Sequence, residues 1–498
     1  MKLHYWLKLF YVAGLMWSAS VASAFEHFIT RDAHQLMDGD KVFRFAGIHA
    51  PELHRIEDDV QGLCDADERG WGQYFKWPTA DEQENWVKSF VRTGHKAMRI
   101  TVLSIEQEFD QACSREVHIQ APLVKGGMPR LNEHAMVHYD RMIALADRYG
   151  LRLILPFVDH WEWWGGRKQL AAFYGESEDD FYDVGSQTYA AYRNIIAQVI
   201  LRRNTFTGRL YRDEKAILAW ETGNELKGTT AEFLSETAAF IKSIDRNHLV
   251  IDGAYINVNS FALNDENVDI ISNHLYENSG TLKPETILRD LKAIGGKKAY
   301  LVGEFGLLPI AQLREIMEEV VNRDYRGAKA VGAFIWGARG RRHNGGFYWH
   351  QEPANPKTWS YHLPGFPEGE FNEELEVIAM VRDAIGKMDG GTSAYPLPVP
   401  EAPKLREIVH PLRINWMGAP VGRRYRVERA TSKGGPWEVI ANNVSDGKHR
   451  YDPHKDAVFS DLSDLVSGMT YFYRVFAINE SGESPPSNVE SVTLGSEN

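Results

Sequence analysis

The feature that most constrains this chain is an alternation of short apolar runs with amphipathic runs, which extends from about residue 25 to residue 388. Eight apolar runs have the length of buried strands, and most of the segments between them repeat their apolar residues with a helical period. The predicted strands are 42–48, 97–101, 152–157, 217–220, 249–252, 269–272, 300–302 and 333–336. The predicted helices are 82–92, 133–149, 187–201, 231–244, 284–293, 313–322 and 373–385.

This alternation predicts the α/β class and, because there are eight strand and helix units, a (β/α)8 TIM barrel. A doubly wound open sheet is the alternative, but no GxGxxG follows any early strand. Long inserts after barrel strands usually build the substrate cleft, so we expect the cleft to form from four of them. These inserts are 50–80, 104–130, 158–186 and 337–371.

Two of the predicted strands lead into a glutamate. The run 217–220 breaks at Gly223 and is followed by Glu225, and the run 300–302 is followed by a glycine and Glu304. A single glutamate at a strand end is more often a solvated loop residue or an ion-pair partner. Two of them with the same pattern predict a pair of carboxyl groups that face each other at the carboxyl-terminal rim of the barrel.

The first 24 residues have the pattern of a secretory signal. Lys2 and Lys8 precede or flank an apolar core at 9–17, and small residues end the segment before Phe25. The apolar core is too short to span a bilayer, although a retained membrane anchor is the alternative. We therefore expect cleavage before Phe25 and a secreted or periplasmic protein with no membrane attachment after cleavage.

Composition narrows the partners that this chain can have. The net charge of −12 argues against a nucleic-acid partner. The aromatic content of 12% suits a neutral ligand with flat apolar faces, such as a sugar. Only two cysteines occur, Cys64 and Cys113, and both fall in predicted loops, where they form one disulfide or remain free. There is no CxxC, no HExxH and no spaced cluster of histidine and aspartate, so we expect no metal and no cofactor.

The composition shifts after residue 388. Residues 389–403 are rich in Gly and then in Pro, which is typical of a semi-stiff linker. Residues 404–498 contain short alternating runs that predict a small all-β sandwich of the immunoglobulin type. The segment 471–484 resembles the penultimate strand and last turn of a fibronectin type III module. In that resemblance Trp416 is the core tryptophan and Tyr471 is the corner tyrosine.

Several segments of the barrel region, in this order, carry a resemblance to a known family. They are Met98-Arg-Ile100, Trp161 with Gly165-Gly166, 203–221, Asn224-Glu225, 241–249, Ser272-Asn-His-Leu-Tyr276, Val302-Gly-Glu-Phe-Gly306 and Gly332-Ala-Phe-Ile-Trp336. Together they resemble glycoside hydrolase family 5, and most of all its endo-β-1,4-mannanase branch, over about residues 40–340. The family usually has proline after its Asn-Glu pair, whereas this chain has Leu226. The stretch after Trp336 is also unlike that branch.

The resemblance implies that residues 25–388 form the catalytic domain of a retaining glycosidase, with Glu304 as the nucleophile and Glu225 as the acid/base. It implies that other side chains orient this pair or contact the sugar, with Trp336 as the floor of the site. These substrate-binding candidates are Arg99, Asn224, His274, Tyr276, Trp336, Trp161 and His160. Glu221 and Glu277 lie close in sequence, but we expect them to point elsewhere.

The function implied is hydrolysis of β-1,4-linked mannan-type polysaccharide by an endo-β-mannanase. An exo-acting β-mannosidase and a β-1,4-glucanase are alternatives within the family, and the long 337–371 insert would favour exo action by closing one end of the cleft. A non-catalytic polysaccharide-binding protein is the alternative outside enzymes. The expected partner is a β-linked polysaccharide or oligosaccharide, and the sequence leaves the oligomeric state open.

Overall fold

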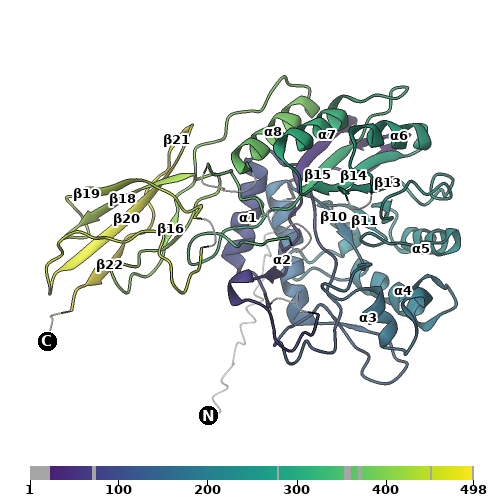
Figure 1. Ribbon diagram of the computed structural model, residues 1–498, viewed down its shortest axis with the longest axis horizontal. Coiled ribbons are helices and arrows are strands. Elements are labelled where there is room, and N and C mark those ends of the chain that lie inside the picture. Colours follow the sequence, from purple (N-terminus) through teal and green to yellow (C-terminus); the bar gives the residue numbers. More distant parts are fainter. Residues whose placement is uncertain are drawn as a thin grey trace, which may run out of the picture.

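A parallel barrel surrounded by helices and a smaller group of antiparallel sheets make up the protein (Figure 1). The computed structural model describes residues 23–69, 74–277, 280–352, 360–367, 373–448 and 451–495. The predicted signal at 1–24 therefore lies almost wholly outside the described residues. Among the residues that are described, no helix combines the length and the apolar character needed to cross a membrane.

All eight predicted barrel strands are present, and seven parallel ladders join them in the order β4-β15-β14-β13-β12-β11-β10-β7. The ring is nearly closed, because β4 and β7 share no ladder but the N–H of Ala50 donates to the carbonyl of Arg99 across the gap (3.3 Å). The strands are β4 (Phe45–Ile48), β7 (Ala97–Arg99), β10 (Arg152–Pro156), β11 (Ile217–Glu221), β12 (Leu249–Asp252), β13 (Ile270–Leu275), β14 (Ala299–Gly306) and β15 (Gly332–Trp336). The prediction of a TIM-like barrel is confirmed.

Helices cover the outside of the barrel, except that the short α3 packs against α4 and η2 (Glu178–Tyr182) within an insert. They are α1 (Ala80–Arg92), α2 (Glu133–Tyr149), α3 (Arg167–Ala172), α4 (Gln187–Ile200), α5 (Ala231–Ile244), α6 (Pro284–Ile294), α7 (Ile310–Asn322) and α8 (Glu374–Met388). Helices α1, α2, α4 and α5 begin with a side chain that accepts from a backbone N–H of the first turn. The side chain of Thr79 accepts from the N–H of Glu82 and the Glu82 side chain accepts in return from the N–H of Thr79, which starts α1. Only α3 was not predicted, because it is a short helix within the 158–186 insert.

The sequence prediction was wrong about the continuous strand 42–48. Val42 and Phe43 belong to β3 (Lys41–Phe43), which pairs antiparallel with β2 (Gln35–Asp38) and, through it, with β1 (Ile29–Asp32). The barrel strand begins only at Phe45, which pairs in parallel with Gly332. The chain changes sheets at Arg44, whose guanidinium donates to the carbonyls of Ala330, Val320 and Val321. A short apolar run does not reveal such a change of sheet.

Two of the inserts are joined by a disulfide. Cys64, in the insert that also holds β5 (Ile56–Glu57), η1 (Asp59–Gln61) and β6 (Phe75–Lys76), is bonded to Cys113, with 5.8 Å between the Cα atoms. Cys113 belongs to the next insert, which ends in the β8–β9 hairpin (Ile119–Gln120 and Arg130–Leu131). Of the two possibilities left open by the sequence, the disulfide is the one observed.

The chain after α8 forms antiparallel sheets, as the sequence predicts. The strands are β16 (Lys404–Leu405), β17 (Trp416–Met417), β18 (Arg424–Ala430), β19 (Glu438–Val444), β20 (Thr470–Asn479), β21 (Gly482–Glu483) and β22 (Glu490–Thr493). Trp416 is fully buried in the apolar cluster of this part, and the Tyr471 hydroxyl accepts from the N–H of Val466 at 2.9 Å. Strand β19 contains no fully buried residue, and its Ile440, Ala441 and Val444 are only partly buried against that cluster.

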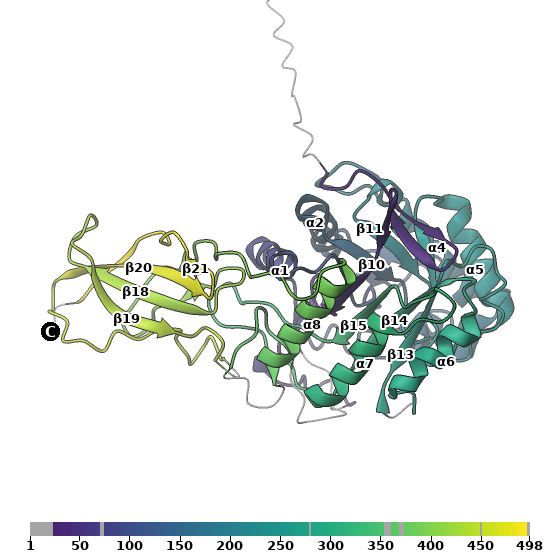
Figure 2. The same ribbon diagram turned by 90° about the horizontal axis from the view of Figure 1, so that it is seen from above.

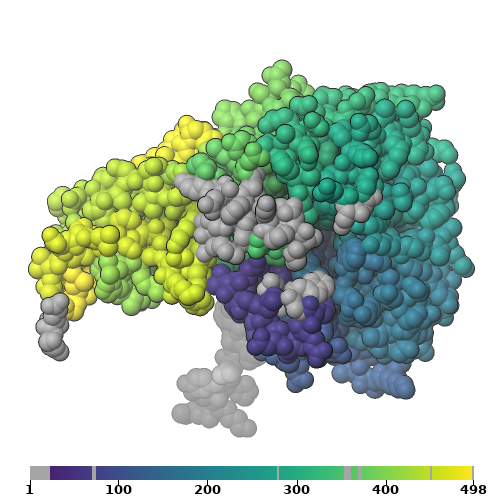
Figure 3. Space-filling model, in the orientation of Figure 1, coloured from purple at the N-terminus to yellow at the C-terminus, as the bar shows by residue number. Residues whose placement is uncertain are grey.

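These C-terminal sheets lie against α1 and the chain near α8 rather than apart from the barrel (Figures 2 and 3). The Asn85 side chain of α1 donates to the carbonyl of Gly418 at 2.7 Å. Arg341, from the insert after β15, donates to Asp446 at 2.9 Å and to the carbonyl of Gly422 at 2.7 Å. The side chains of Arg341 and Asp446 are at most 1% exposed, so the ion pair is buried at this junction.

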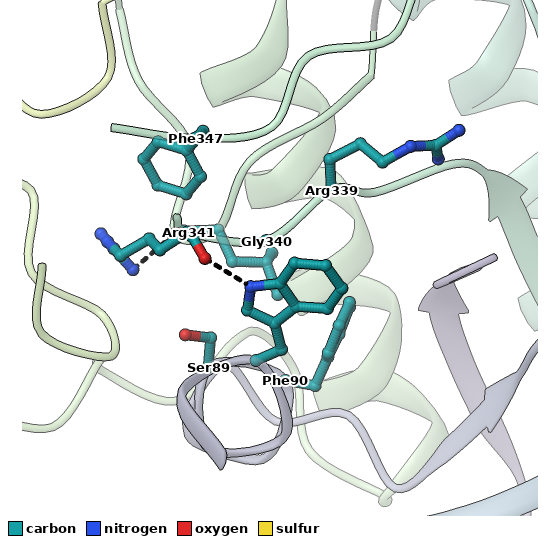
Figure 4. A pocket seen from close by; sticks show the side chains of 8 residues that line it. Ser89, Phe90, Arg339, Gly340, Arg341 and Phe347 are labelled. Atoms are coloured by element: carbon teal, nitrogen blue, oxygen red, sulfur yellow. Dashed lines mark hydrogen bonds between the residues drawn. The ribbon is translucent and has the colours of Figure 1, made fainter. Parts of the chain in front are cut away.

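The junction also contains a small cavity behind Trp86, whose Nε1–H donates to the carbonyl of Arg341 (Figure 4). Ser89, Phe90 and Phe347 are among the other residues that line it. Its volume of about 10 Å³ admits at most one water molecule. The cavity is therefore a packing gap rather than a ligand site.

Candidate active site

The end of β14 and its neighbour β13 define the site. Glu304 lies on β14 and pairs in register with His274 on β13. Gly303 precedes Glu304, and a Cβ atom at this glycine would lie 2.7 Å from Nε2 of His274 and 2.4 Å from Oγ of Ser272. The missing side chain of Gly303 is therefore what allows His274 to pack beside the carboxyl group.

Glu225 reaches the same place from β11, four residues after the strand ends. Its backbone is left-handed (φ 52°), a conformation that costs energy in any residue other than glycine and is common at functional sites. The carboxyl group is almost buried, with 8% of the residue exposed. Its Oε1 lies 2.8 Å from Nδ1 of His274, and its Oε2 accepts from Nε1 of Trp161 at 2.5 Å.

The two predicted carboxyl groups face each other. The facing atoms of Glu225, His274 and Glu304 all lie within 4.8 Å of one another. Glycosidases that retain configuration hold their carboxyl groups about 5–5.5 Å apart, whereas inverting enzymes hold them about 6.5–9.5 Å apart to admit water. The spacing in this protein therefore suits direct attack by one carboxylate on the sugar.

Arg99 and Tyr276 hold Glu304. NH1 of Arg99 donates to Oε1 of Glu304 at 2.6 Å, and the Tyr276 hydroxyl donates to Oε2 at 2.9 Å. The same guanidinium donates to Glu221 through Nε (2.7 Å) and to the side-chain oxygen of Asn224 through NH2 (2.8 Å). Because Arg99 is only 1% exposed, these charge-assisted bonds fix the direction of Glu304 in a nearly dry environment.

The two carboxyl groups differ in the neighbours that act on their pKa values. Burial raises the pKa of Glu225 to about 7, although the Trp161 hydrogen bond and the charge of Arg99 oppose this rise. Burial also raises the pKa of Glu304, but there His274, Arg99 and the Tyr276 hydrogen bond act against it. Burial lowers the pKa of His274 to about 4, so its ring is neutral near pH 7. A carboxyl group with a pKa near 7 is suited to carry a proton, and the direct hydrogen bonds from Arg99 and Tyr276 favour the charged form of Glu304.

Two predicted aromatic residues border the carboxyl pair. Trp336, at the end of β15, donates its Nε1–H to Glu352, and its ring centroid is 4.8 Å from that of His49. Trp161 is 39% exposed, and the Lys227 amine lies 4.0 Å from its ring centroid. Each presents an aromatic ring near a carboxyl group, as a sugar-stacking residue requires.

His160 lies differently from the other predicted residues. Its Nδ1 accepts from Nε of Arg167 at 3.1 Å and from the N–H of Lys227 at 3.4 Å. The backbone N–H of His160 donates to the carbonyl of Asn224 at 3.0 Å. These bonds connect the insert after β10 to the segment that carries Glu225. A direct contact between His160 and substrate stays a prediction.

The sequence analysis missed three residues of this network. The expectation that Glu221 points elsewhere was wrong, because it pairs with Arg99 from the last position of β11. His49 is fully buried, with Nε2 3.5 Å from Oε1 of Glu304. Asp159 accepts from the Asn224 amide at 2.9 Å. A strand-end position was the available signal for Glu221 and His49, but the sequence alone does not show which way a side chain points.

Among the residues that the structure describes, two groups of side chains bring together atoms that are able to bind a metal ion. One is the carboxyl pair itself with His274. The other consists of Glu57, Asp59 and His350, whose ligand atoms also lie within 4.8 Å of one another. The first is explained by the hydrogen bonds described above, and the second is outside that network.

A parallel barrel with two buried carboxyl groups at the carboxyl ends of its strands is typical of glycoside hydrolases. Comparison with protein families agrees: residues 83–304 match the model of glycoside hydrolase family 5, β-mannosidase-like. This matched part runs from within α1 to Glu304 and contains both buried carboxyl groups.

Curated relatives match a shorter part of the chain. Mannan endo-1,4-β-mannosidase 1 of Oryza sativa subsp. japonica is 37% identical over 139 residues, which cover 25% of this chain and 32% of that protein. Mannan endo-1,4-β-mannosidase F of Aspergillus clavatus is 35% identical over 120 residues, covering 23% of this chain and 26% of that protein. The chain thus spans about a third or less of the length of these relatives.

Solved structures show the same fold. A family 5 mannosidase from Rhizomucor miehei aligns with a TM-score of 0.54 and 16% identity, over 73% of this chain and 98% of that one. The endo-β-1,4-mannanase from Thermotoga petrophila aligns with a TM-score of 0.53 and 18% identity, over 92% of this chain and 99% of that one. At these identities the likeness supports the architecture alone.

Proposed function

We propose that this protein is a retaining glycoside hydrolase that cleaves β-1,4-linked mannan-type polysaccharide by double displacement. The observation that carries the proposal is the pair of buried carboxyl groups, Glu225 and Glu304, whose facing atoms lie within 4.8 Å. Mannan is the substrate because the curated relatives of the matched segment are mannan endo-1,4-β-mannosidases. The mode of cleavage is endo, as in those relatives.

In the first step Glu304 attacks the anomeric carbon while Glu225 protonates the departing oxygen. Glu304 enters this step ionised because Arg99 donates to Oε1 and Tyr276 to Oε2. Glu225 enters it protonated because burial raises its pKa to about 7. The sugar is then bonded to Glu304, and the leaving chain departs with the proton from Glu225.

In the second step water displaces Glu304 from the sugar, and Glu225 takes the proton of that water. Glu304 carries no charge while it is bonded to the sugar, so one repulsive neighbour of an ionised Glu225 is absent at this stage. Two displacements at the same carbon restore the β configuration. The reaction consumes one water for each bond cleaved and needs no cofactor.

Other side chains orient the sugar. Asn224 is fixed by Arg99 and Asp159, which leaves its amide aligned for the sugar 2-hydroxyl, a contact that strengthens in the transition state. His274 bridges the two carboxyl groups at 2.8 and 3.6 Å and lines the space beside the reacting sugar. Trp336 supplies the aromatic floor, and Trp161 supplies a neighbouring subsite.

An exo-acting β-mannosidase is the second candidate. It is favoured by one contact, the hydrogen bond from the Trp336 indole to Glu352. This bond holds the insert after β15 directly against the proposed floor, where an insert of this length would limit the number of sugars on one side. A β-1,4-glucanase remains an alternative in the same family, and a polysaccharide-binding protein without activity is disfavoured because both carboxyl groups are present.

Alanine variants of the two glutamates test the roles. An aryl β-mannoside has a good leaving group and hardly needs the proton, so Glu225→Ala still forms the glycosyl-enzyme, accumulates it, and is accelerated by azide to a β-mannosyl azide. Glu304→Ala lacks the covalent step. On mannan the loss of proton transfer alone lowers the rate of Glu225→Ala by on the order of 10²–10⁴-fold. A β-mannosyl azide from Glu304→Ala together with an α-mannosyl azide from Glu225→Ala would reverse the two roles, and full activity of both variants would refute the site.

A product time course separates the candidates. Endo cleavage of mannan gives mixed oligosaccharides from the start, whereas exo cleavage gives the monosaccharide alone. Faster hydrolysis of cellulose than of mannan would favour the glucanase.

The rest of the chain completes the proposal. The first 24 residues act as a cleaved secretion signal, and the mature protein is secreted or periplasmic. Residues 404–498 act as a fibronectin type III-like module, which is supported by the buried Trp416 and by the hydrogen bond between the Tyr471 hydroxyl and the N–H of Val466.

A further inference from the structure

A second group of carboxyl and imidazole side chains lies between two inserts and takes no part in the proposed reaction. Glu57 is on β5, Asp59 begins η1, and His350 comes from the insert after β15. Glu57 is 1% exposed and His350 is 5% exposed. Nearly 300 residues of chain separate His350 from the two acidic residues, so only the fold brings them together.

The distances in this group suit a shared metal ion. Nδ1 of His350 lies 3.4 Å from Oε2 of Glu57 and 3.2 Å from Oδ1 of Asp59. The contact with Asp59 is a hydrogen bond, but both distances are longer than the about 2.7–2.9 Å of a strong bond between a charged imidazole and a carboxylate. Two ligands of one ion, each about 2.0–2.2 Å from it, lie about 3.0–3.5 Å apart in octahedral or tetrahedral geometry. The observed separations fall in this range.

Each of the three side chains is also held from behind. Nε1 of Trp163 donates to the other oxygen of Glu57 at 3.1 Å. The N–H of Gln351 donates to the other oxygen of Asp59 at 3.1 Å. Nε2 of His350 faces Oε1 of Glu352 at 3.6 Å. Ligands of protein-bound metals are commonly oriented in this way, because their remaining polar atoms bind neighbouring groups.

One buried oxygen in this group accepts no hydrogen bond from the described residues, and its nearest charged neighbour is the His350 imidazole. Oε2 of Glu57, which faces His350, has no hydrogen bond within the part of the chain that the structure describes. The nearby Glu52 is paired with Arg339 (2.9 Å), so that cation is already used. A buried carboxylate oxygen without a donor is costly, and a cation removes the cost.

We propose that Glu57, Asp59 and His350 form a binding site for a divalent transition-metal ion, with zinc as the preferred ion. An imidazole with two carboxylates suits zinc, whereas calcium and magnesium prefer oxygen ligands alone. The ion joins the insert after β4 to the insert after β15. Because Glu352 contacts both His350 and the Trp336 indole, the ion also fixes the insert against the proposed sugar floor. Binding of the ion itself does not depend on the proposed hydrolysis.

Isothermal titration of the full-length, chelator-treated protein with zinc chloride tests the proposal. The wild-type protein binds zinc in the group, and Asp59→Asn and His350→Gln each weaken this binding by about 100-fold or more. Asp59 is partly exposed, so its replacement by asparagine leaves the surrounding packing in place. Thermal unfolding gives a second measurement: zinc raises the Tm of the wild-type protein and leaves the Tm of Asp59→Asn unchanged.

Glu304→Gln is the matched control, because the carboxyl pair with His274 is the other three-residue group with facing ligand atoms. This variant keeps zinc binding if the proposal is right. A wild-type protein that binds two ions, one of which is lost in Asp59→Asn, also supports it. Absence of zinc binding in the wild-type protein, or binding that is lost in Glu304→Gln and kept in Asp59→Asn, would overturn it.

Discussion

Replacing Trp161 by phenylalanine removes one hydrogen bond from Glu225 while it leaves an aromatic ring beside it. In the wild-type protein the indole Nε1–H donates to Oε2 of Glu225 and so stabilises the ionised carboxylate. A hydrogen bond to a charged group is worth about 1.5–3 kcal/mol, and 1.36 kcal/mol corresponds to one pKa unit. Because Trp161 is 39% exposed, solvent replaces part of the lost bond, and we expect the pKa of Glu225 to rise by about one unit.

The pH dependence of kcat/KM on a mannan oligosaccharide measures this change. Hydrolysis of such a substrate needs protonated Glu225, so activity falls as the pH rises through the pKa of that group, which is about 7 in the wild-type protein. A higher pKa keeps the acid protonated to higher pH. The basic limb of the profile of Trp161→Phe therefore moves upward by about one unit, and the acidic limb, which depends on ionised Glu304, does not follow it.

Trp163→Phe is the matched control, because it makes the same substitution two residues further along the insert. Its Nε1–H donates to Glu57 rather than to Glu225, so its basic limb stays at the wild-type position. The reasoning fails if the basic limb of Trp161→Phe does not move, or if the two variants shift it equally. A lower kcat/KM with an unchanged profile would assign Trp161 to sugar binding alone.

Three further predictions concern the rest of the chain. Replacing both Cys64 and Cys113 by serine lowers the free energy of unfolding by about 4 kcal/mol, because the disulfide closes a loop with a sequence separation of 49 and so restricts the unfolded chain. Urea denaturation measures this loss, and an unchanged unfolding midpoint would contradict it. Arg341→Met leaves the Asp446 carboxylate buried and unpaired at the junction, and lowers the free energy of unfolding by about 3–5 kcal/mol. The double variant Arg341→Met with Asp446→Asn loses less than the sum of the two single changes. Strict additivity in this double-mutant cycle would show that the ion pair does not act as a unit. N-terminal sequencing of exported protein finds Phe25 at or near the first position, and material that still begins with Met1 would exclude cleavage.

Much of the barrel was predictable because its elements repeat in simple periods. Strands buried on both faces are short apolar runs, and the helices between them have one apolar face. The facing positions of Glu225 and Glu304 were predictable because each follows such a run and a nearby glycine. The sequence pattern does not show where the chain passes from one sheet to another, which it does at Arg44.

The residues that escaped prediction depend on partners far away in sequence. Glu221 is the last residue of an apolar strand, and only the presence of Arg99, 122 positions earlier, explains its burial. The group of Glu57, Asp59 and His350 has no ligand spacing that resembles a metal motif, because its members come from opposite ends of the barrel sequence. Contacts of this kind arise from the closed ring, which no local pattern describes.

The order of strands around the barrel also bears on how the chain folds during its synthesis. The first barrel strand, β4, forms its ladder with the last one, β15, and has no ladder with β7, which follows it in the chain. Its partner therefore leaves the ribosome roughly 290 residues later, which takes on the order of 15–60 s at typical rates of translation. Until then β4 has no ladder partner in the barrel. The ring closes, and the hydrogen-bond network around Glu304 becomes complete, only after nearly the whole barrel has been made.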